Sequence, residues 1–316
     1  MYMKSAAHNI MNQKPNKILI DSSNLLHRVV WITESGQRKI SPVYIFLTSV
    51  KKYADKFECN NIYSVWDKRL IRGVKNYRRQ AKQADYKGNR DTAKNERVFS
   101  FEDETTEILS ALGVKNMYPG ILEADDVISW MSKETKGNKM IVSVDQDMLQ
   151  LVDEKTSVYS PIKDIIITNE NFEEVVGVPR EQFLRYKSLI GDKSDNLPGV
   201  ERCGKKTAAK LLEQCETDQL LEEKLGSEKI KPYYFNLKMI DLEYGLKQHP
   251  DDVELYQEQY NKHKQTAPDF DKFIDLCKSR NFNKIITDSY VWKERFTETN
   301  TTRTLENIVN TLGLSK

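Results

Sequence analysis

The sequence predicts an α/β protein with a mostly parallel central sheet, followed by a helical C-terminal region. Short apolar runs typical of buried strands alternate with segments of helical periodicity, which is the pattern of βαβ units. The strand runs are 17–20, 62–66 and 139–144, and the helical segments are 42–58, 101–112 and 123–135. Residues 157–168 predict a further hairpin, and beyond about residue 178 the pattern is helical, with helices expected at 180–190 and 205–214.

Composition indicates a globular protein of the cytoplasm. The chain has 316 residues, 39% of them hydrophobic, which is enough to bury one large core or two modest ones. No run approaches the ~18 apolar residues of a membrane span, and the N-terminal residues are too polar for a signal peptide. The four cysteines and four histidines show no spacing typical of zinc ligands.

Basic charge is concentrated in one segment. The 49 lysines and arginines nearly cancel the 47 acids, so the formal net charge of +2 does not by itself indicate a nucleic-acid-binding protein. Residues 68–97, however, contain eleven lysines and arginines against three acids, a local charge of +8. This segment directly follows Asp67.

Acidic residues follow the strand runs. Asp21 and Asp67 come directly after two of the runs, and Asp145 and Asp147 follow the third. Because the carboxyl ends of parallel strands converge on one crevice, these side chains are expected to lie close together. Such carboxylates repel one another unless hard cations neutralise them, and oxygen-only ligation selects Mg²⁺ or Mn²⁺ rather than zinc. The sequence therefore predicts a divalent-metal site.

Two further acidic groups have ordinary explanations when each is taken singly. Glu123, Asp125 and Asp126 open a helical segment, where acids interact favourably with the helix dipole. Asp192 and Asp195 lie in a segment with the composition of a turn. A single Asp after a strand is also a common N-cap or loop residue. The joint occurrence of all these groups favours the metal site.

A short glycine-bounded turn separates the helices expected at 180–190 and 205–214. Lys205, Lys206 and Thr207 begin the second helix, where positive charge is unfavourable unless an external anion is present. Backbone N–H groups of such a turn and of the following helix can hold a phosphate. A plain hairpin of two helices is the alternative.

The acidic and basic segments resemble those of the 5′ nuclease, or flap endonuclease, family. This family includes the 5′ nuclease domain of bacterial DNA polymerase I and the free-standing 5′-to-3′ exonucleases and RNase H enzymes of bacteriophages. No polymerase segment follows, so a stand-alone phage-type enzyme, acting in the host cytoplasm, is the closer likeness. The resemblance spans about residues 18–242, and its motifs are Tyr86-Lys87-Gly88-Asn89-Arg90, Glu123-Ala124-Asp125-Asp126, 143–151 and 191–200.

The resemblance implies a carboxylate cluster that binds two Mg²⁺ ions, with Mn²⁺ able to substitute, and catalysis without a protein nucleophile. Among these ligands, Asp125 and Asp145 are also expected to be catalytic. The implied ligands are Asp21, Asp67, Glu123 and Asp125 mainly for one ion, Asp145, Asp147, Asp192 and Asp195 for the other, and Asp126 as an additional acid of the bacterial and phage branch.

The basic segment corresponds to the family's helical arch above the metal site. Lys87 and Arg90 are three residues apart and would place positive charge on the scissile phosphate. Tyr86 would stack on a base near the junction. Without the resemblance and the position after Asp67, a solvated charged face with a half-buried tyrosine is the preferred explanation of these three residues.

The resemblance also implies a helix-three-turn-helix that grips duplex DNA and often holds a potassium ion. Arg202 stands where relatives carry the first glycine of the turn, which leaves the turn's backbone and a K⁺ site open and makes Arg202 an alternative phosphate contact. The DNA contacts expected here are Gly199, Arg202, Gly204, Lys205, Lys206 and Thr207.

These expectations divide the chain into consecutive regions. The expected regions are a disordered leader at 1–14, a nuclease core of the PIN-like type at 15–178 with the arch at 68–100, a helical DNA-binding region at 179–295 with the helix-three-turn-helix at 189–212, and a linker with a terminal helix at 296–316.

The expected function is structure-specific hydrolysis at 5′ flaps and 5′ ends of DNA or RNA–DNA hybrids during replication, including removal of RNA primers by an RNase H activity. The expected partners are flapped or branched duplex DNA and RNA–DNA hybrid, with a single-strand-binding protein or sliding clamp as candidate protein partners of a monomeric enzyme. Two alternatives stay open. One is a PIN-like ribonuclease acting on structured or single-stranded RNA, and the other is a non-catalytic junction-binding protein, which would be expected to have lost carboxylates.

Overall fold

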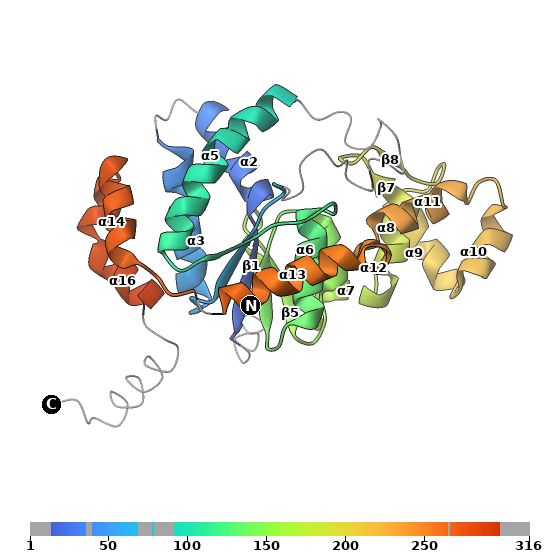
Figure 1. The fold of residues 1–316 in the computed structure, drawn as a ribbon. Helices are drawn as coiled ribbons and strands as arrows, with labels where there is room; N and C mark the ends of the chain where they lie inside the picture. The colour runs from blue at the N-terminus through green and yellow to red at the C-terminus, as the bar shows by residue number, and fades with distance from the viewer. Residues whose placement is uncertain (1–13, 36–39, 69–77, 79–91, 265, 298–316) are drawn as a thin grey trace, which may run out of the picture.

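The computed structural model describes residues 14–35, 40–68, 78, 92–264 and 266–297 (Figure 1). Several predictions from the sequence therefore lie outside the described residues. They are the leader at 1–13, most of the arch with Tyr86, Lys87 and Arg90, and the terminal segment at 298–316. Within the described part of the chain, no helix is long and apolar enough to cross a membrane.

Six strands in the described residues form one sheet, in the order β3-β2-β1-β4-β5-β6. All neighbouring pairs are parallel except β5 and β6, which form the predicted hairpin. The fold class predicted from the sequence is therefore confirmed. The strands are β1 (Lys17–Asp21), β2 (Ile62–Val65), β3 (Lys115–Met117), β4 (Lys139–Val142), β5 (Thr156–Ser160) and β6 (Ile165–Ile167).

The strand order reverses between β1 and β4, which are neighbours in the sheet. From β1 the chain proceeds to β2 and β3 on one side, and from β4 to β5 and β6 on the other. Open α/β sheets form their ligand crevice at such a switch point, outside the carboxyl ends of the strands. The acids at the end of β1 and just after β2 and β4 thus lie at the ends of three adjacent strands.

Two apolar clusters cover the two faces of the sheet. All five residues of β1 are buried, and successive residues alternate between the faces, so Leu19 joins one cluster while Ile18 and Ile20 join the other. On the Leu19 face lies α6 (Ala124–Glu134), and on the opposite face lie α2 (Ser22–Ser35), α3 (Pro42–Lys56) and α5 (Thr92–Ala111). The helix at 22–35 and the strand at 115–117 were not predicted, and α5 begins nine residues before the predicted start at 101.

The helical region begins beyond residue 178 and matches the expected helices closely. The second helix of the predicted pair, α9, spans Lys205–Gln214 as expected, while 180–190 divides into a 3-10 turn and α8. The elements after the sheet are α7 (Phe172–Val176), η3 (Arg180–Gln182), α8 (Phe183–Ile190), β7 (Gly191–Asp192), β8 (Leu197–Pro198), α9 (Lys205–Gln214), α10 (Asp218–Leu225), α11 (Lys231–Ile240) and α12 (Leu242–Gln248).

The chain then returns to the sheet. α13 (Pro250–His263) runs back along α6, and α14 (Phe270–Ser279), α15 (Asn283–Thr287) and α16 (Ser289–Thr297) follow (Figure 1). α14 packs on α5 and α16 packs on α3, at the opposite end of the molecule from α8 to α11 (Figure 1). These last helices therefore add to the core around the sheet, although most of their residues fall within the expected helical DNA-binding region 179–295.

The packing of α14 and α16 leads to a stability prediction. Phe273 is fully buried against Trp292, so Phe273→Ala should lower the free energy of unfolding by about 3–5 kcal/mol. Tyr290 is 74% exposed in the same helical group, and Tyr290→Ala should change that free energy by less than about 0.5 kcal/mol. Urea unfolding of both variants tests this, and equal effects would contradict the packing described.

Candidate metal and nucleic-acid site

Asp21 lies at the centre of the acidic edge. It is the last residue of β1, it is buried, and its Oδ2 accepts a hydrogen bond of 2.7 Å from Ser143 Oγ, just after β4. Burial raises the pKa of Asp21 to about 7; the Ser143 bond opposes this shift, while the nearby charges of Asp145 and Asp67 add to it. The structure thus brings the acids of three strands within mutual electrostatic reach.

Asp145 and Asp147 are placed by the turn after β4. Asp145 N donates to Ser143 Oγ, and Asp145 Oδ1 accepts from Asp147 N at 2.9 Å, which caps the 3-10 helix η2 (Gln146–Leu151). Burial raises the pKa of Asp147 to about 7, and the Asp145 charge adds to the shift. The Ser143 hydroxyl therefore hydrogen-bonds both to the Asp21 side chain and to the Asp145 backbone, and it holds these two acids near each other.

Lys187 of α8 links the strand edge to the helical region. Its buried Nζ lies 3.0 Å from Asp147 Oδ1 and 2.6 Å from Asp192 Oδ2. Burial opposes ionisation of Asp192, but hydrogen bonds from Lys187 and Ser194 hold its pKa below the usual value. Lys187 was not predicted from the sequence, because a lysine on a helical segment carries no signal of burial. Asp195, the residue after Ser194, is half-buried.

The N-terminus of α6 forms a second acidic corner. Asp67, just beyond β2, accepts a hydrogen bond of 3.0 Å from Ala124 N, which brings it beside Glu123 and Asp125. Glu123 is buried and Asp125 is partly exposed. The acids expected to share the first metal site thus come from β1, from beyond β2 and from the start of α6.

Arg78, from the predicted arch, is buried against this corner. Its guanidinium donates to both oxygens of Asp126, at 2.6 and 2.8 Å, and to Glu123 Oε2 at 3.2 Å. Its Nε donates to Met239 O near the end of α11. Asp126 is fully buried and also accepts from Glu123 N. Both oxygens of Asp126 accept hydrogen bonds in this way, and its role as an additional metal-binding acid stays a prediction.

The carboxylate oxygens of these acids are the kind of ligand that hard divalent cations prefer. In this structure no three His, Cys, Asp or Glu side chains of the described residues converge closely enough to enclose a metal ion. Electrostatic repulsion nevertheless connects the acids in series, from Asp67 through Asp21, Asp145 and Asp147 to Asp192. Because burial and this repulsion destabilise the ionised carboxylates, divalent cations are the natural counter-charge, and oxygen ligands suit Mg²⁺ or Mn²⁺.

A polar cleft opens beside Asp145 and Asp192. It has a volume of about 320 Å³ and is bordered by Asn24, Asp145, Lys187, Asp192 and Ser194, among others. The cleft is therefore lined by residues from the first turn of α2, from the turn after β4 and from the helical region.

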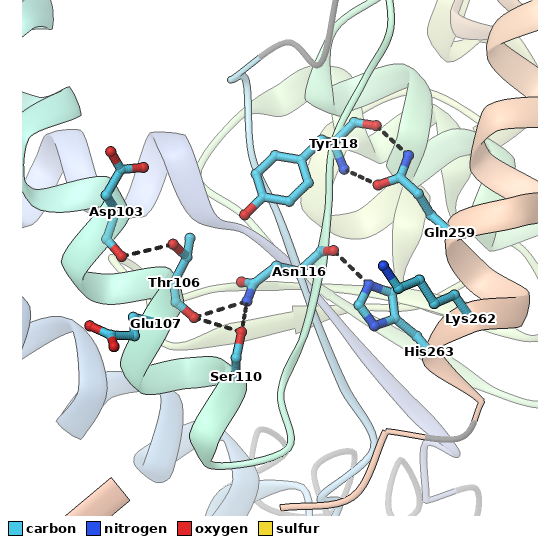
Figure 2. A pocket seen from close by; sticks show the side chains of 9 residues that line it. All are labelled: Asp103, Thr106, Glu107, Ser110, Asn116, Tyr118, Gln259, Lys262 and His263. Carbon is cyan, nitrogen blue, oxygen red and sulfur yellow. Dashed lines mark hydrogen bonds between the residues drawn. The ribbon is translucent and has the colours of Figure 1, made fainter. Parts of the chain in front are cut away.

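A larger pocket of about 420 Å³ lies elsewhere, between α5 and α13 along the edge strand β3 (Figure 2). There the Gln259 side chain exchanges two hydrogen bonds with the backbone of Tyr118, and His263 Nε2 lies 2.8 Å from Asn116 O. These contacts cover the free edge of β3 (Figure 2). None of the predicted acidic ligands lines this pocket, so the smaller cleft is the candidate site.

The glycine-bounded turn lies next to the cleft. Gly191 has φ +74°, and a Cβ there would lie 2.4 Å from Gly199 N, so only glycine fits. Arg202 adopts φ +59°, the left-handed conformation that glycine favours, with its side chain 88% exposed. The chain thus keeps a glycine-like turn at Arg202 and directs a positive charge outward. Gly204 caps α9, whose first residues Lys205, Lys206 and Thr207 are exposed.

Two protein-family models together match most of the chain. The N-terminal resolvase-like domain of 5′-3′ exonucleases matches residues 16–177, and the C-terminal SAM fold of 5′-3′ exonucleases matches residues 178–268. The protein belongs to the 5′-3′ exonuclease family. The boundary between the two matches coincides with the expected change from sheet to helices, and α14 to α16 lie beyond the second match.

Bacterial members of the 5′-3′ exonuclease family show the similarity in sequence. The 5′-3′ exonuclease of Halalkalibacterium halodurans is 32% identical over 238 residues, covering 70% of this chain and 76% of that protein. The 5′-3′ exonuclease of Bacillus subtilis is 35% identical over 204 residues, covering 62% and 67%. DNA polymerase I of Thermus thermophilus is 30% identical over 213 residues, which cover 65% of this chain but 25% of the polymerase.

Solved structures show the same fold at lower identity. The T5 D15 protein co-crystallised with metal ions superposes with a TM-score of 0.65 at 19% identity, covering 79% of this chain and 99% of that one. The catalytic core of Rad2 in complex with DNA superposes with a TM-score of 0.54 at 14% identity, covering 94% and 99%. At these identities the likeness establishes the fold.

The buried contact of Arg78 with Asp126 leads to a prediction. Arg78→Met should lower the free energy of unfolding by about 3–5 kcal/mol, because it leaves the Asp126 carboxylate buried without a counter-charge. The double variant Arg78→Met with Asp126→Leu removes both charges and should recover most of the loss. Urea unfolding measures both. A double variant that is less stable than Arg78→Met would show that the pair is not the source of the effect.

Proposed function

We propose that this protein is a divalent-metal-dependent 5′ nuclease that hydrolyses phosphodiesters at 5′ flaps and 5′ ends of DNA and RNA–DNA hybrids. The supporting observation is the series of mutually repelling carboxylates at the switch point of the sheet, next to an exposed basic turn. Carboxylates bind the cations that hydrolysis of a phosphodiester requires, and the turn supplies phosphate contacts beside them.

The proposed ligands fall into two groups. Asp21, Asp67, Glu123 and Asp125 hold one divalent ion, and Asp145, Asp147, Asp192 and Asp195 hold the other. Two such ions supply an activated water and neutralise the leaving oxygen of an in-line displacement. Mg²⁺ is the proposed ion, and Mn²⁺ has the same preference for oxygen ligands.

The chain's own side chains orient these acids. Ser143 donates to Asp21 Oδ2, and the same hydroxyl accepts from Asp145 N, so one residue fixes two acids from neighbouring strands. Lys187 fixes Asp192 relative to Asp147 and reduces the repulsion between them. Substrate phosphates are held by Lys205, Lys206 and the N–H groups at the start of α9. In the segment 79–91, Lys87 and Arg90 remain proposed contacts to the scissile phosphate, and Tyr86 a proposed stacking residue.

Duplex DNA with a branch or flap is the proposed substrate. The structurally similar T5 D15 flap endonuclease was solved with DNA and metal ions, and Rad2 was solved with a DNA substrate. The match of residues 178–268 to a SAM fold of 5′-3′ exonucleases favours this substrate over that of a PIN-like ribonuclease. Retention of every proposed ligand argues against a non-catalytic junction-binding protein. RNase H activity, a K⁺ ion at the Arg202 turn and contacts with a clamp or single-strand-binding protein remain predictions.

A substrate comparison tests the proposed function. A 5′-flap duplex, a nicked duplex and an RNA–DNA hybrid, each labelled at one strand, are incubated with the protein in Mg²⁺ and separately in EDTA. Cleavage near the 5′ junction in Mg²⁺ and its loss in EDTA are expected. Cleavage of single-stranded RNA in preference to all three would support the ribonuclease alternative, and no cleavage would support the binding protein.

The first variant tests the acidic cluster. Asp145→Asn should reduce cleavage of the flap by about a hundredfold or more, because it removes charge from the metal site without changing side-chain size. Asp275→Asn, an exposed acid on α14 paired with Lys278, is the matched control and should keep the wild-type rate. Single-turnover rates measure both, and an unchanged rate for Asp145→Asn would remove this acid from the active centre.

The second variant tests the basic turn. Lys206→Ala should weaken duplex binding and reduce the magnitude of the salt slope by roughly 0.9, the loss of one phosphate contact, with little change in the single-turnover rate of bound substrate. Lys293→Ala, an exposed lysine on the distant α16, should leave both unchanged. Binding isotherms at several salt concentrations give the slopes. If both variants have wild-type slopes, α9 does not contact the phosphate backbone.

A further inference from the structure

A buried aspartate on α13 holds the loop that leads into the α6 corner. Asp252 is 3% exposed, and its carboxylate accepts hydrogen bonds from three successive backbone N–H groups. The donors are Gly120 N at 3.2 Å, Ile121 N at 3.1 Å to either oxygen, and Leu122 N at 3.0 Å. Successive N–H groups of this kind form an anion-binding concavity.

The loop is shaped for this carboxylate. A Cβ on Gly120 would lie 2.3 Å from Asp252 Oδ1, so glycine at this position is what lets the carboxylate reach the backbone. Tyr256, one turn further along α13, donates its hydroxyl to Asp252 Oδ2 at 2.9 Å. The contact is therefore built from both sides, by the loop and by α13.

An ordinary explanation for Asp252 is that acids are favourable in the first turn of a helix. Asp252 does lie in the first turn of α13, next to Asp251. Asp251, however, is exposed, whereas the Asp252 side chain is buried and satisfies N–H groups about 130 residues away in the chain. The helix dipole alone explains neither this burial nor the requirement for Gly120.

The residue that follows the held loop is Glu123. Its side chain contacts Arg78, and its N–H is held by Asp126. The next N–H, of Ala124, is held by Asp67. The backbone from 120 to 124 is thus fixed at every residue by an acidic side chain, and Asp252 is the acid that comes from the helical region rather than from the neighbourhood of the sheet.

We propose that Asp252 is a positioning residue, which fixes the loop 120–122 so that Glu123 and Asp125 meet their metal ion in one orientation. The proposal rests on the proposed function, because it takes these two acids as ligands. Through Asp252, α13 and the helical region that precedes it are tied to the metal site. Residues that orient ligands in this way typically change metal affinity about tenfold or more when substituted.

The test is metal binding by the full-length protein without substrate. Mn²⁺ is titrated into wild type, Asp252→Asn and Gly120→Ala, with affinity followed by calorimetry and the fold checked by thermal unfolding. Asp252→Asn should weaken one of the two Mn²⁺ sites, the one that Glu123 and Asp125 hold, about tenfold, since an amide cannot accept three N–H groups equally well. Gly120→Ala perturbs the same contact from the loop side and should weaken it similarly. The double variant should be little weaker than either single one, because both disturb one contact.

A matched control separates positioning from general stability. Asp218 is an acid of the helical region that accepts hydrogen bonds from Tyr233 and Arg185, away from the acidic corner. Asp218→Asn should lower the unfolding temperature and leave the Mn²⁺ affinity unchanged. If Asp252→Asn and Asp218→Asn lower the unfolding temperature without changing the affinity, Asp252 has only a structural role. If Asp252→Asn does not fold, the affinity of Gly120→Ala decides the question.

A reference variant distinguishes failure of this inference from failure of the proposed function. Asp125→Asn removes a proposed ligand and should weaken Mn²⁺ binding more than Asp252→Asn does. If Asp125→Asn weakens binding and neither Asp252→Asn nor Gly120→Ala does, the ligand assignment stands and the positioning role of Asp252 is refuted. If Asp125→Asn binds Mn²⁺ as wild type does, the ligand assignment itself is refuted.

Discussion

Electrostatic repulsion among buried carboxylates is the constraint on which the rest of this structure depends. Asp21 and Asp147 both have pKa values raised to about 7, chiefly because burial disfavours the charged form. A cluster of this kind persists in a fold only if positive charge and N–H or hydroxyl donors surround it. Ser143, Lys187 and the backbone around residue 124 provide part of that surrounding.

The two acidic groups are supported in different ways. The second group is stabilised by a charge, because Lys187 lies between Asp147 and Asp192. The first is stabilised by backbone and by the Arg78 guanidinium, which joins Asp126, Glu123 and the end of α11. Buried polar networks of this type rigidify a site when every member has its partners. Both supports include residues of the helical region, so the acids of the sheet are held partly from outside the sheet.

The last three helices, α14 to α16, extend the apolar core on the α3 and α5 side of the sheet. α14 packs on α5 and α16 packs on α3, and Arg280, the residue after α14, pairs with Glu104 and Glu107 of α5. The first turns of α5, from Thr92, belong to the basic segment 68–97 that the resemblance identifies with the arch. The position of α5, and hence of the end of that segment, depends on helices that come more than 150 residues later in the chain.

Local pattern in the sequence determined the strands β1, β2 and β4, the β5–β6 hairpin, α9 and the acids that follow the strands, because strand periodicity and helix starts depend on neighbours a few residues apart. The short β3 and the polar start of α2 lacked such a pattern. Tertiary structure alone decided the partners of Arg78, Lys187 and Asp252, since a charged residue on a helix or in a basic segment is ordinarily solvated. The ion pair between Arg78 and Asp126 likewise appears only in the tertiary structure. Burial of a charge requires a partner brought close by the fold. The partners here lie 40 to 161 residues away, apart from the local Lys187–Asp192 and Asp252–Tyr256 contacts.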